Sequence, residues 1–392
     1  MSWFRLTMAD IEAFYKGLGG HPFFTIEDLY EFAKAQGSIT STTSGYRNPI
    51  YGALIWRQLN TEANVFGALP KTNWPRSGWR VKTGWSVNAA SDLSIAETGT
   101  LPETVYPPIT TVKATPKVLT INFEISEVME ALAEVSKDDI WGAVDQVRAD
   151  IGVEFIKMIN RQLLTKAIGR NDGESSSSDG YNLTALDRIV SSTDEVSDFS
   201  ITAGSEDIYD IDRSGASWAQ PVVKYAANGQ ELTDELIRNT LAEAREKGAN
   251  TNIIITGYDT YAKIQGLYMN FIRYVPLAET KVQFGINGIE SAVGMDLGIN
   301  VSALYGIPVI QAVDTPGDGD GYVSRIYMLD TSDPEGYGIP RLSISVLRPV
   351  EYFETRDYAL LQKFAVRGVY RFAGEVTARY LPGQAKIRDI LA

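Results

Sequence analysis

Few residues in this sequence could perform catalytic or metal-binding chemistry. The chain has one histidine, His21, and no cysteine, which excludes disulfides and thiolate metal sites. A single imidazole also disfavours an enzyme that depends on histidine for acid–base catalysis. The sequence lacks the phosphate-binding loop, the serine nucleophile elbow and the H-E-x-x-H zinc motif. We therefore predict no catalytic residues and interpret His21 as a contact or helix-end residue.

One short segment, rich in Asp and Gly, could suggest a cation site. Asp314, Asp318 and Asp320 are interspersed there with three glycines. An EF-hand loop needs ligands at positions 1, 3 and 5 and a glutamate at position 12, and this segment lacks that spacing. We therefore predict a turn between two strands, and neither a metal nor any other cofactor.

Composition predicts a large globular chain. Its 392 residues are 44% hydrophobic and 10% aromatic, which is enough for two or more packed cores. The formal net charge of −13 opposes nonspecific nucleic-acid binding over the whole surface, although local patches could still contact DNA. No apolar run approaches the ~20 residues needed to cross a bilayer, so no membrane contact is expected.

Residues 351–390, near the end of the sequence, contain an unusually long extended pattern. A charged turn leads into a run with apolar and Arg-bearing faces, which stops at Leu381-Pro382-Gly383 and resumes at Gln384. We interpret this strand as too long and too polar for a buried core strand. It suits an elongated sheet shared between neighbouring molecules.

Residues 75–125 predict a long hairpin. In the first arm, Trp79, Val81 and Trp85 alternate with polar residues, and the return arm alternates from Leu119 to Ile125. About thirty residues separate the two arms, which is uneconomical within one compact domain. The loop is therefore expected to lie on a neighbouring subunit.

Helical patterns flank a mixed α/β region. A long helix is expected from a cap at Ser136 to Ala167, about 45 Å long. Thr233 should cap a second helix that ends before Gly248. Beyond it we expect a strand at Asn252–Gly257, a helix at Tyr258–Leu267, and strands at Ile307–Val313, Arg325–Asp330 and Leu342–Val350.

The first 65 residues predict two short helices, Met8–Lys16 and Ile26–Ala35. Helices this short are marginal in water and need tertiary contacts. We interpret the block as an arm that clamps a neighbouring subunit through its aromatic residues Trp3, Phe4, Phe14, Phe23 and Phe24.

In the order and spacing of these elements, the chain resembles HK97-fold major capsid proteins of tailed bacterial or archaeal viruses. The resemblance covers residues from about 75 to 392. It implies an α+β fold with an N-terminal arm (1–65), an E-loop hairpin with its return strand (75–125) and a peripheral domain with a spine helix (126–180). A mixed α/β axial domain (181–345) and a C-terminal strand returning to the peripheral domain (346–392) complete it.

The resemblance also implies a function. The protein would be a virion component assembled in the host cytoplasm, in which pentamers and hexamers form an icosahedral shell around viral double-stranded DNA. It would be no enzyme and would bind DNA without sequence specificity. Portal, scaffold or cement proteins would be its further partners.

On this interpretation six hairpin residues contact neighbouring copies, namely Trp74, Arg76, Trp79, Arg80, Lys82 and Trp85. The alternative is that the aromatic residues fill the chain's own core. Some shells of this family crosslink through a hairpin lysine, and Lys71, Lys82 and Lys113 are candidates here. The sequence identifies no acceptor and carboxylate for that reaction, so we predict no crosslinks.

Two other functions remain open at this point. An encapsulin-like nanocompartment would share the fold and would hold cargo through its N-terminal helix. An unrelated soluble α/β enzyme is the second alternative. Particle mass separates the enzyme from a shell, and the neighbouring genes separate the two kinds of shell.

Overall fold

The computed structural model describes thirteen segments of the chain, residues 63–74, 76–85, 95, 97–99, 106–135, 143–165, 181–192, 208–213, 215–226, 228–268, 302–317, 321–356 and 363–392. The two helices expected in the N-terminal block lie outside these residues, as do the aromatic residues Trp3, Phe4, Phe14, Phe23 and Phe24 that we expect to contact a neighbouring subunit.

The chain divides into two compact units. Unit 1 comprises Met1–Arg57, Asn122–Ile151 and Phe353–Val369. Unit 2 comprises Gln58–Ile121, Gly152–Tyr352 and Tyr370–Ala392.

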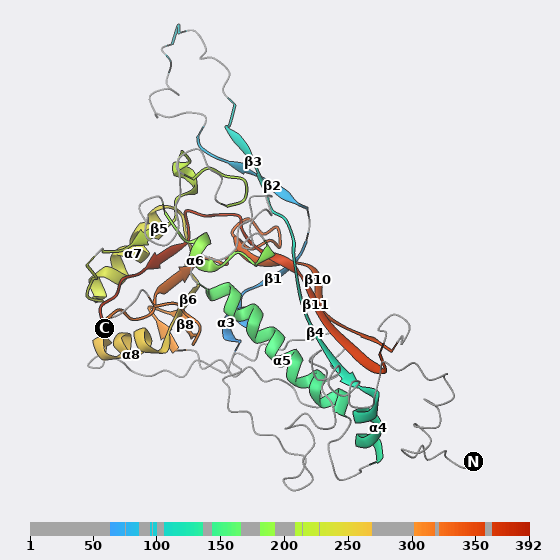
Figure 1. The fold of residues 1–392 in the computed structure, drawn as a ribbon. Helices are drawn as coiled ribbons and strands as arrows, with labels where there is room; N and C mark the ends of the chain where they lie inside the picture. Colours follow the sequence, from blue (N-terminus) through green and yellow to red (C-terminus); the bar gives the residue numbers. More distant parts are fainter. Residues whose placement is uncertain are drawn as a thin grey trace, which may run out of the picture. The chain divides into compact units, whose positions relative to one another are not determined.

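The described helices and strands are shown in Figure 1. The helices are α3 (Asn64–Ala68), α4 (Glu127–Val135), α5 (Ala143–Leu164), α6 (Leu186–Ile189), the 3₁₀ turn η3 (Ser217–Ala219), α7 (Asp234–Glu246) and α8 (Tyr258–Tyr268). The strands are β1 (Lys71–Asn73), β2 (Gly78–Lys82), β3 (Ile109–Lys113), β4 (Lys117–Ser126), β5 (Val222–Lys224), β6 (Ile253–Thr256), β7 (Ser302–Leu304), β8 (Ile307–Gln311), β9 (Ile326–Leu329), β10 (Leu342–Thr355), β11 (Ala365–Ala378) and β12 (Ala385–Ile387).

Unit 2 contains a six-stranded sheet with the order β5-β12-β9-β6-β8-β7. Because side chains alternate along a strand, each strand presents a different set to each face. Ile326 and Met328 belong to an apolar cluster with Ile237 of α7 and Ile264 of α8. The intervening Tyr327 hydrogen-bonds to α6 instead. Helices α7 and α8 therefore cover one face of this sheet, and α6 lies on the other.

Helix α7 follows the sequence-based expectation closely. The Thr233 hydroxyl accepts a hydrogen bond from the Leu236 amide at 3.2 Å, as an N-cap should. Ile237 and Ala244 of the predicted apolar stripe are buried. Gly248 has a φ of +88°, a conformation that favours glycine and ends the helix. The predicted strand Asn252–Gly257 and helix Tyr258–Leu267 are likewise confirmed as β6 and α8.

The second large sheet has the order β1-β10-β11-β4. Strand β11 is fourteen residues long and has no exposed residue. Our interpretation that this strand is too polar to be buried within its own chain is wrong. Its charged side chains have partners on adjacent strands, with Arg367 2.7 Å from Glu124 in unit 1 and Arg371 2.7 Å from Glu351 in unit 2.

The hairpin has a different return strand from the expected one. Strand β2 pairs antiparallel with β3, so that Trp79 is opposite Val112 and Lys82 is opposite Ile109. The predicted return arm, 119–125, lies instead in β4 of the four-stranded sheet. The predicted alternation of apolar and polar side chains is confirmed in this strand, because Phe123 and Ile125 are buried and Asn122 is exposed. Periodicity identified the strand but not its partner.

The long helix is shorter than expected among the described residues. Helix α5 has 22 residues and is therefore about 33 Å long. The expected cap at Ser136 lies outside the described residues, and α4 is a separate helix before it. The predicted apolar stripe is confirmed at Val147, Phe155 and Leu163, which are all buried.

The chain end does not remain with the four-stranded sheet. The predicted break at Leu381-Pro382-Gly383 is confirmed, and β12 follows it. Strand β12 pairs with β5 and β9 of the six-stranded sheet. We expected the whole segment 346–392 to return to the peripheral domain. This expectation is wrong for its last residues, because β12 joins the six-stranded sheet. The cause is the turn at Pro382 and Gly383, after which the chain enters a different sheet.

Candidate assembly interface at the hairpin base

The hairpin stands on a tight turn, residues 208–211, of unit 2. Tyr209 and Asp210 have positive φ angles of 52° and 64°, which are uncommon for residues other than glycine. The buried Tyr209 hydroxyl holds the turn, since it donates to the Val376 carbonyl at 2.8 Å and accepts from the Ala378 amide at 3.0 Å. Burial, and next the charge of Glu375, raise the pKa of Tyr209, so the hydroxyl remains a donor.

Both hairpin strands contact this turn. The Trp79 ring of β2 packs edge-to-face on Tyr209, with the ring centroids 5.2 Å apart. Lys113 of β3 donates its amide to the Tyr209 carbonyl at 3.1 Å, and its ammonium group pairs with Asp210. Where β2 starts and β3 ends, a Cβ on Gly78 would lie 2.4 Å from the Val112 carbonyl oxygen, so only glycine fits there. The turn thus fixes the base of the hairpin.

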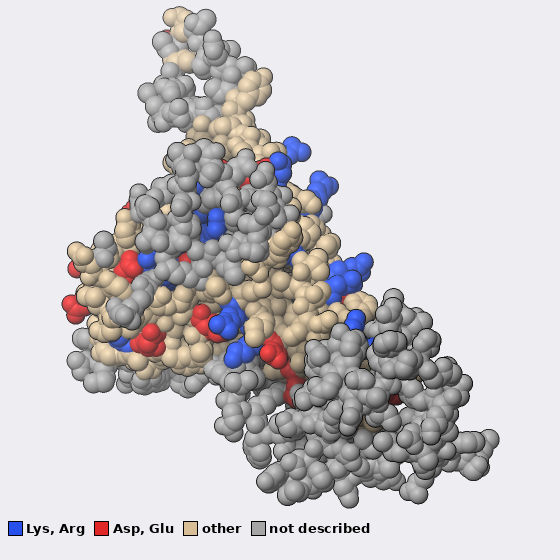
Figure 2. Space-filling model, viewed as in Figure 1, with Lys and Arg blue, Asp and Glu red and all other residues tan. Residues whose placement is uncertain are grey.

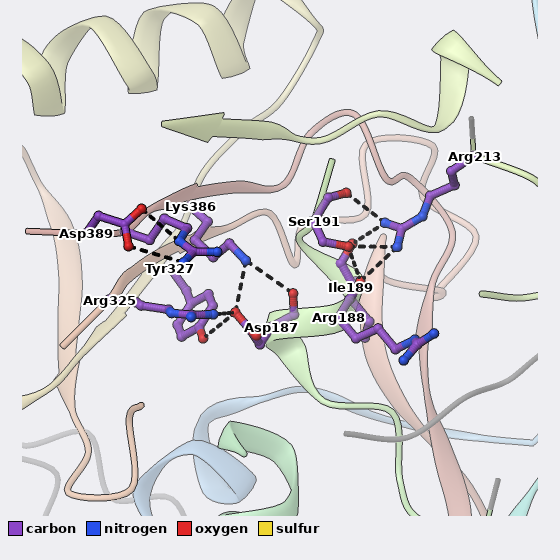
Figure 3. A network of polar contacts seen from close by, with 10 residues as sticks. Asp187, Arg188, Ile189, Ser191, Arg213, Arg325, Tyr327, Lys386 and Asp389 are labelled. Atoms are coloured by element: carbon purple, nitrogen blue, oxygen red, sulfur yellow. Dashed lines mark hydrogen bonds and ion pairs between the residues drawn. The ribbon is translucent and has the colours of Figure 1, made fainter. Parts of the chain in front are cut away.

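A buried charge cluster holds α6 against the six-stranded sheet (Figure 3). Asp187 of α6 pairs with Arg325, receives a hydrogen bond from Lys386 at 2.9 Å and another from the Tyr327 hydroxyl at 3.2 Å. The charged side chains have no exposed surface. Burial alone would raise the pKa of Asp187, but Lys386 and Arg325 hold it well below its usual range.

Arg213 connects this cluster to the hairpin turn. Its guanidinium donates to the Ser191 carbonyl at 2.8 Å, the Ser191 hydroxyl at 2.7 Å and the Arg188 carbonyl at 3.1 Å (Figure 3). These acceptors lie at and just after the end of α6, where helix carbonyls lack intrahelical partners. The turn 208–211 is therefore tied through α6 to the sheet, and the hairpin base has a rigid support.

Residues of the hairpin base line two grooves. We call the larger, of about 520 Å³, the basic groove; it is lined by Trp74, Arg76, Gly78, Trp79, Arg80, Thr111, Val112, Lys113, Ile339, Ser345, Thr377 and Arg379. The smaller, of about 300 Å³, lies next to Lys82, Trp85 and Trp218. Figure 2 shows basic side chains at the surface below the hairpin, whereas acidic ones gather over α7.

The six hairpin residues predicted to contact neighbours all line one or both grooves. Arg76, Arg80 and Lys82 are exposed, and Trp74 is half-buried. Trp85 is 80% exposed, with the Lys82 ammonium 4.8 Å from its ring centroid. Trp79 is half-buried, and its ring packs on Tyr209 of its own chain. That these residues contact other copies stays a prediction.

Sequence reasoning missed several residues of the site. Arg379 follows β11, and its guanidinium lies 5.8 Å from the Trp79 ring centroid. Burial lowers its pKa. Asp210 is another, and its pairing with Lys113 joins residues almost a hundred positions apart in the sequence. No local pattern could have revealed these contacts, since the partners meet only in the folded chain.

The lysines considered for crosslinking and the aspartates considered for cation binding lie in different parts of the molecule. The Lys71 ammonium donates to the Phe66 carbonyl at 2.7 Å, and burial lowers its pKa to about 8. Asp314 accepts a hydrogen bond from Asn160 at 3.5 Å, while Asp318 and Asp320 lie outside the described residues, as does His21.

Within the described segments, no group of three or more potential ligands could hold a metal ion. Nor does any helix there combine the length and apolar character needed to cross a bilayer.

Comparison with known proteins identifies the fold. Neither a family model nor a curated protein sequence matches the chain. Among solved structures, a chain of the cyanophage A-1(L) capsid asymmetric unit superimposes with a TM-score of 0.60 at 15% identity, over 88% of this chain and 97% of that one. A capsid chain of the native GTA particle gives a TM-score of 0.52 at 13% identity, over 90% and 98% of the two chains.

The chain has an HK97-like capsid fold. The expected α+β class and the expected fold resemblance are confirmed. The encapsulin of Synechococcus elongatus PCC 7942 also matches, with a TM-score of 0.46 at 9% identity over 88% and 93% of the two chains. That similarity is too low to support an argument about this chain. Among the tryptophans whose burial the structure describes, Trp85, just after β2, is the most exposed.

Proposed function

We propose that this chain is a major capsid protein that self-assembles into an icosahedral shell around viral double-stranded DNA. The observation that carries the proposal is the fold, which matches a cyanophage capsid chain over 88% of this chain and 97% of that one. A fold alone can host several functions. The exposed apolar residues of the hairpin supply the second, independent support.

Several large apolar side chains on and next to the hairpin are exposed, although exposed ones also occur elsewhere in the described chain, for example Tyr337 and Phe364. Trp85 is 80% exposed, Tyr106 82%, Ile109 58% and Ile95 51%. A soluble monomer rarely leaves large apolar side chains gathered on one projecting element, because such patches mark interaction surfaces. Burying each in a neighbour would contribute roughly 1.5–3 kcal/mol. Repeating one such head-to-tail contact by rotation generates closed rings, as pentamers and hexamers require.

The role we propose is structural and not enzymatic. The packaged DNA would be enclosed without sequence-specific contacts, and the net charge of −13 leaves most of the surface repulsive to phosphates. Portal, scaffold or cement proteins would act as further partners, and assembly in the host cytoplasm would deliver the chain to the virion.

Particle mass and electron microscopy test the proposal. The purified protein should form closed particles of megadalton mass in negative stain, well above the 43.1 kDa chain. Deletion of residues 84–107 should leave a folded subunit with an unchanged melting temperature that forms no closed shells. A wild-type chain that stays monomeric, alone and when co-expressed with its neighbouring genes, would overturn the proposal.

The contents of the particles separate the two kinds of shell. Nuclease-resistant double-stranded DNA inside particles recovered from the host indicates a virus. An encapsulated enzyme without DNA would instead indicate a nanocompartment.

A further inference from the structure

The two faces of the β2–β3 ribbon differ in character. Residues directly opposite each other in an antiparallel pair point to the same side, and Trp79 is opposite Val112. This face is packed, because Val112 is buried and the Trp79 ring lies on Tyr209. The other face is exposed to solvent, and we call it the basic face. It comprises Arg80, Lys82, Ile109, Thr111 and Lys113.

The sequence around both strands carries positive charge without acidic residues. The stretches 63–91 and 104–123, which contain β2 and β3, have no aspartate or glutamate. The whole chain has 49 such residues and a net charge of −13, so these stretches are a local exception. Their basic residues are Lys71, Arg76, Arg80, Lys82, Lys113 and Lys117.

Three of these cations lack a counter-charge within the described segments. No carboxylate there pairs with Arg76, Arg80 or Lys82, and all three are exposed. Lys113 differs, because it pairs with Asp210. Arg76 and Arg80 also line the basic groove, which has no acidic side chain in its lining. An exposed surface with such an excess of one charge attracts a polyanion.

The shape of the surface favours a nucleic-acid duplex among polyanions. Strands β2 and β3 have five residues each, so the ribbon is about 16 Å long. A duplex presents one negative charge per ~1.7 Å of its axis, so roughly ten phosphate charges lie within this length. The guanidinium fork matches phosphate geometry, and the exposed Thr111 hydroxyl can donate to a phosphate oxygen. A two-stranded ribbon is also narrow enough to enter the major groove.

We propose that the basic face of the β2–β3 ribbon, together with Arg76, binds the phosphate backbone of duplex DNA. Binding is independent of base sequence, because contacts to phosphate carry no sequence information. The inference rests on the proposed function in one respect, since that function brings the chain together with viral DNA. The exposed apolar residues Trp85 and Tyr106 of the same hairpin are not part of this site and stay available to neighbouring copies.

Fluorescence anisotropy of a short labelled duplex measures the contact on unassembled full-length subunits. The face variant carries Arg76→Gln, Arg80→Gln and Lys82→Gln. It should bind roughly tenfold or more weakly than the wild type at about 100 mM NaCl. Each phosphate contact contributes about 0.9 to the slope of log affinity against log salt, so the loss of three contacts should lower the slope by about 2.7. Duplexes of unrelated sequence should bind the wild type with equal affinity.

A matched control removes the same charge elsewhere. Arg161→Gln, Arg245→Gln and Arg348→Gln neutralise three exposed arginines outside both grooves, and this variant should bind DNA as the wild type does. Melting temperatures establish that both variants fold, since exposed substitutions change stability little. A face variant with wild-type affinity and slope would overturn the inference. An equal loss of binding in the control variant, or a wild type that binds no duplex at about 50 mM NaCl, would do the same.

Two further results separate this inference from its alternatives. If poly-glutamate binds the wild type more tightly than the duplex does, and fails to bind the face variant, the basic face is a site for an acidic protein and the inference is wrong. Wild-type subunits that form shells but bind no DNA would overturn the inference and leave the capsid function standing. DNA binding that is lost in the face variant, in a protein that never closes shells, would support the inference and contradict the capsid function.

Discussion

Two arginine-containing clusters in unit 2 differ in what balances their charge. In the cluster around Asp187, Arg325 and Lys386 are fully buried and share one carboxylate. In the basic groove, Arg76 and Arg80 are exposed and lie beside no acidic residue of the groove. A buried charge must find its partner within the fold, because leaving it unpaired costs several kcal/mol. An exposed charge can stay solvated until another molecule supplies the partner. The first cluster therefore serves the fold, and the second is suited to association.

The largest effect should come from breaking the buried cluster. Asp187→Ala leaves Arg325 and Lys386 buried without their shared carboxylate, and should lower the free energy of unfolding of the free subunit by about 3–5 kcal/mol. Urea denaturation measures this loss. The control is Glu354→Ala, which removes an exposed partner of Arg356 and should cost about 1 kcal/mol or less. Equal losses for the two variants would remove the distinction between the clusters.

A substitution in the turn 208–211, which connects the two clusters, should lower the free energy of unfolding by an intermediate amount. Tyr209→Phe removes the hydroxyl that joins the Val376 carbonyl and the Ala378 amide, and should cost about 1–3 kcal/mol. Hydrogen exchange in β2 should accelerate, because the hairpin base rests on this residue. Tyr225→Phe, at a 43% exposed position, serves as the control. Unchanged exchange in β2 would mean that the turn does not support the hairpin.

Glu375 sharpens the comparison, because it is a buried acid that forms no ion pair within the described residues. Burial raises its pKa from 4.5 to about 8, although amides of Thr184 and Val376 bond one of its oxygens and the charge of Lys117 also acts to lower the pKa. Its other oxygen has no hydrogen-bond partner among the described residues. The folded state therefore keeps a proton that the unfolded state releases above pH 4.5.

Linkage then gives the sign of the pH dependence. The stability associated with protonated Glu375 is fully present below pH 4.5 and is lost as pH rises through about 8. Within this window the loss should be about 1 kcal/mol per pH unit. Denaturation of wild type and Glu375→Gln at pH 6 and pH 7 should show a shallower pH dependence in the variant. Parallel curves would show that Glu375 does not titrate there.

The smallest effect on the subunit should come from the basic groove. Arg80→Gln removes an exposed charge and should change the free energy of unfolding by less than about 0.5 kcal/mol. The same variant should assemble more slowly at low salt, which light scattering would record. A destabilisation above 1 kcal/mol would place Arg80 among the residues that hold the fold.

Local patterns predicted the single elements well and their partners poorly. The cap, apolar stripe and terminal glycine of α7 are local, so the helix could be recognised with nearly correct ends. The strand at 119–125 was also recognised, yet it was assigned to the wrong sheet. Strand pairing depends on contacts between residues far apart in sequence, and alternation carries no information about the partner.

Only some residues of the candidate site were predicted from the sequence. Trp79, Arg80 and Lys82 were found because apolar and basic residues alternate within β2. Lys113 and Arg379 complete the basic groove from elsewhere in the chain, and Asp210 fixes its base. The sequence showed that β11 is polar. It did not show that Glu124 and Glu351 would pair with the arginines of this strand.

The sequence alone thus determined the scarcity of catalytic and metal-binding residues and the helical and extended periods. These follow from residue types and short spacings, which folding does not alter. The tertiary structure decided the pairing of β2 with β3, the burial of β11, the sharing of Asp187 and the excess positive charge of the groove. Each depends on which distant residues come together and how much water they exclude, and only the folded chain sets both.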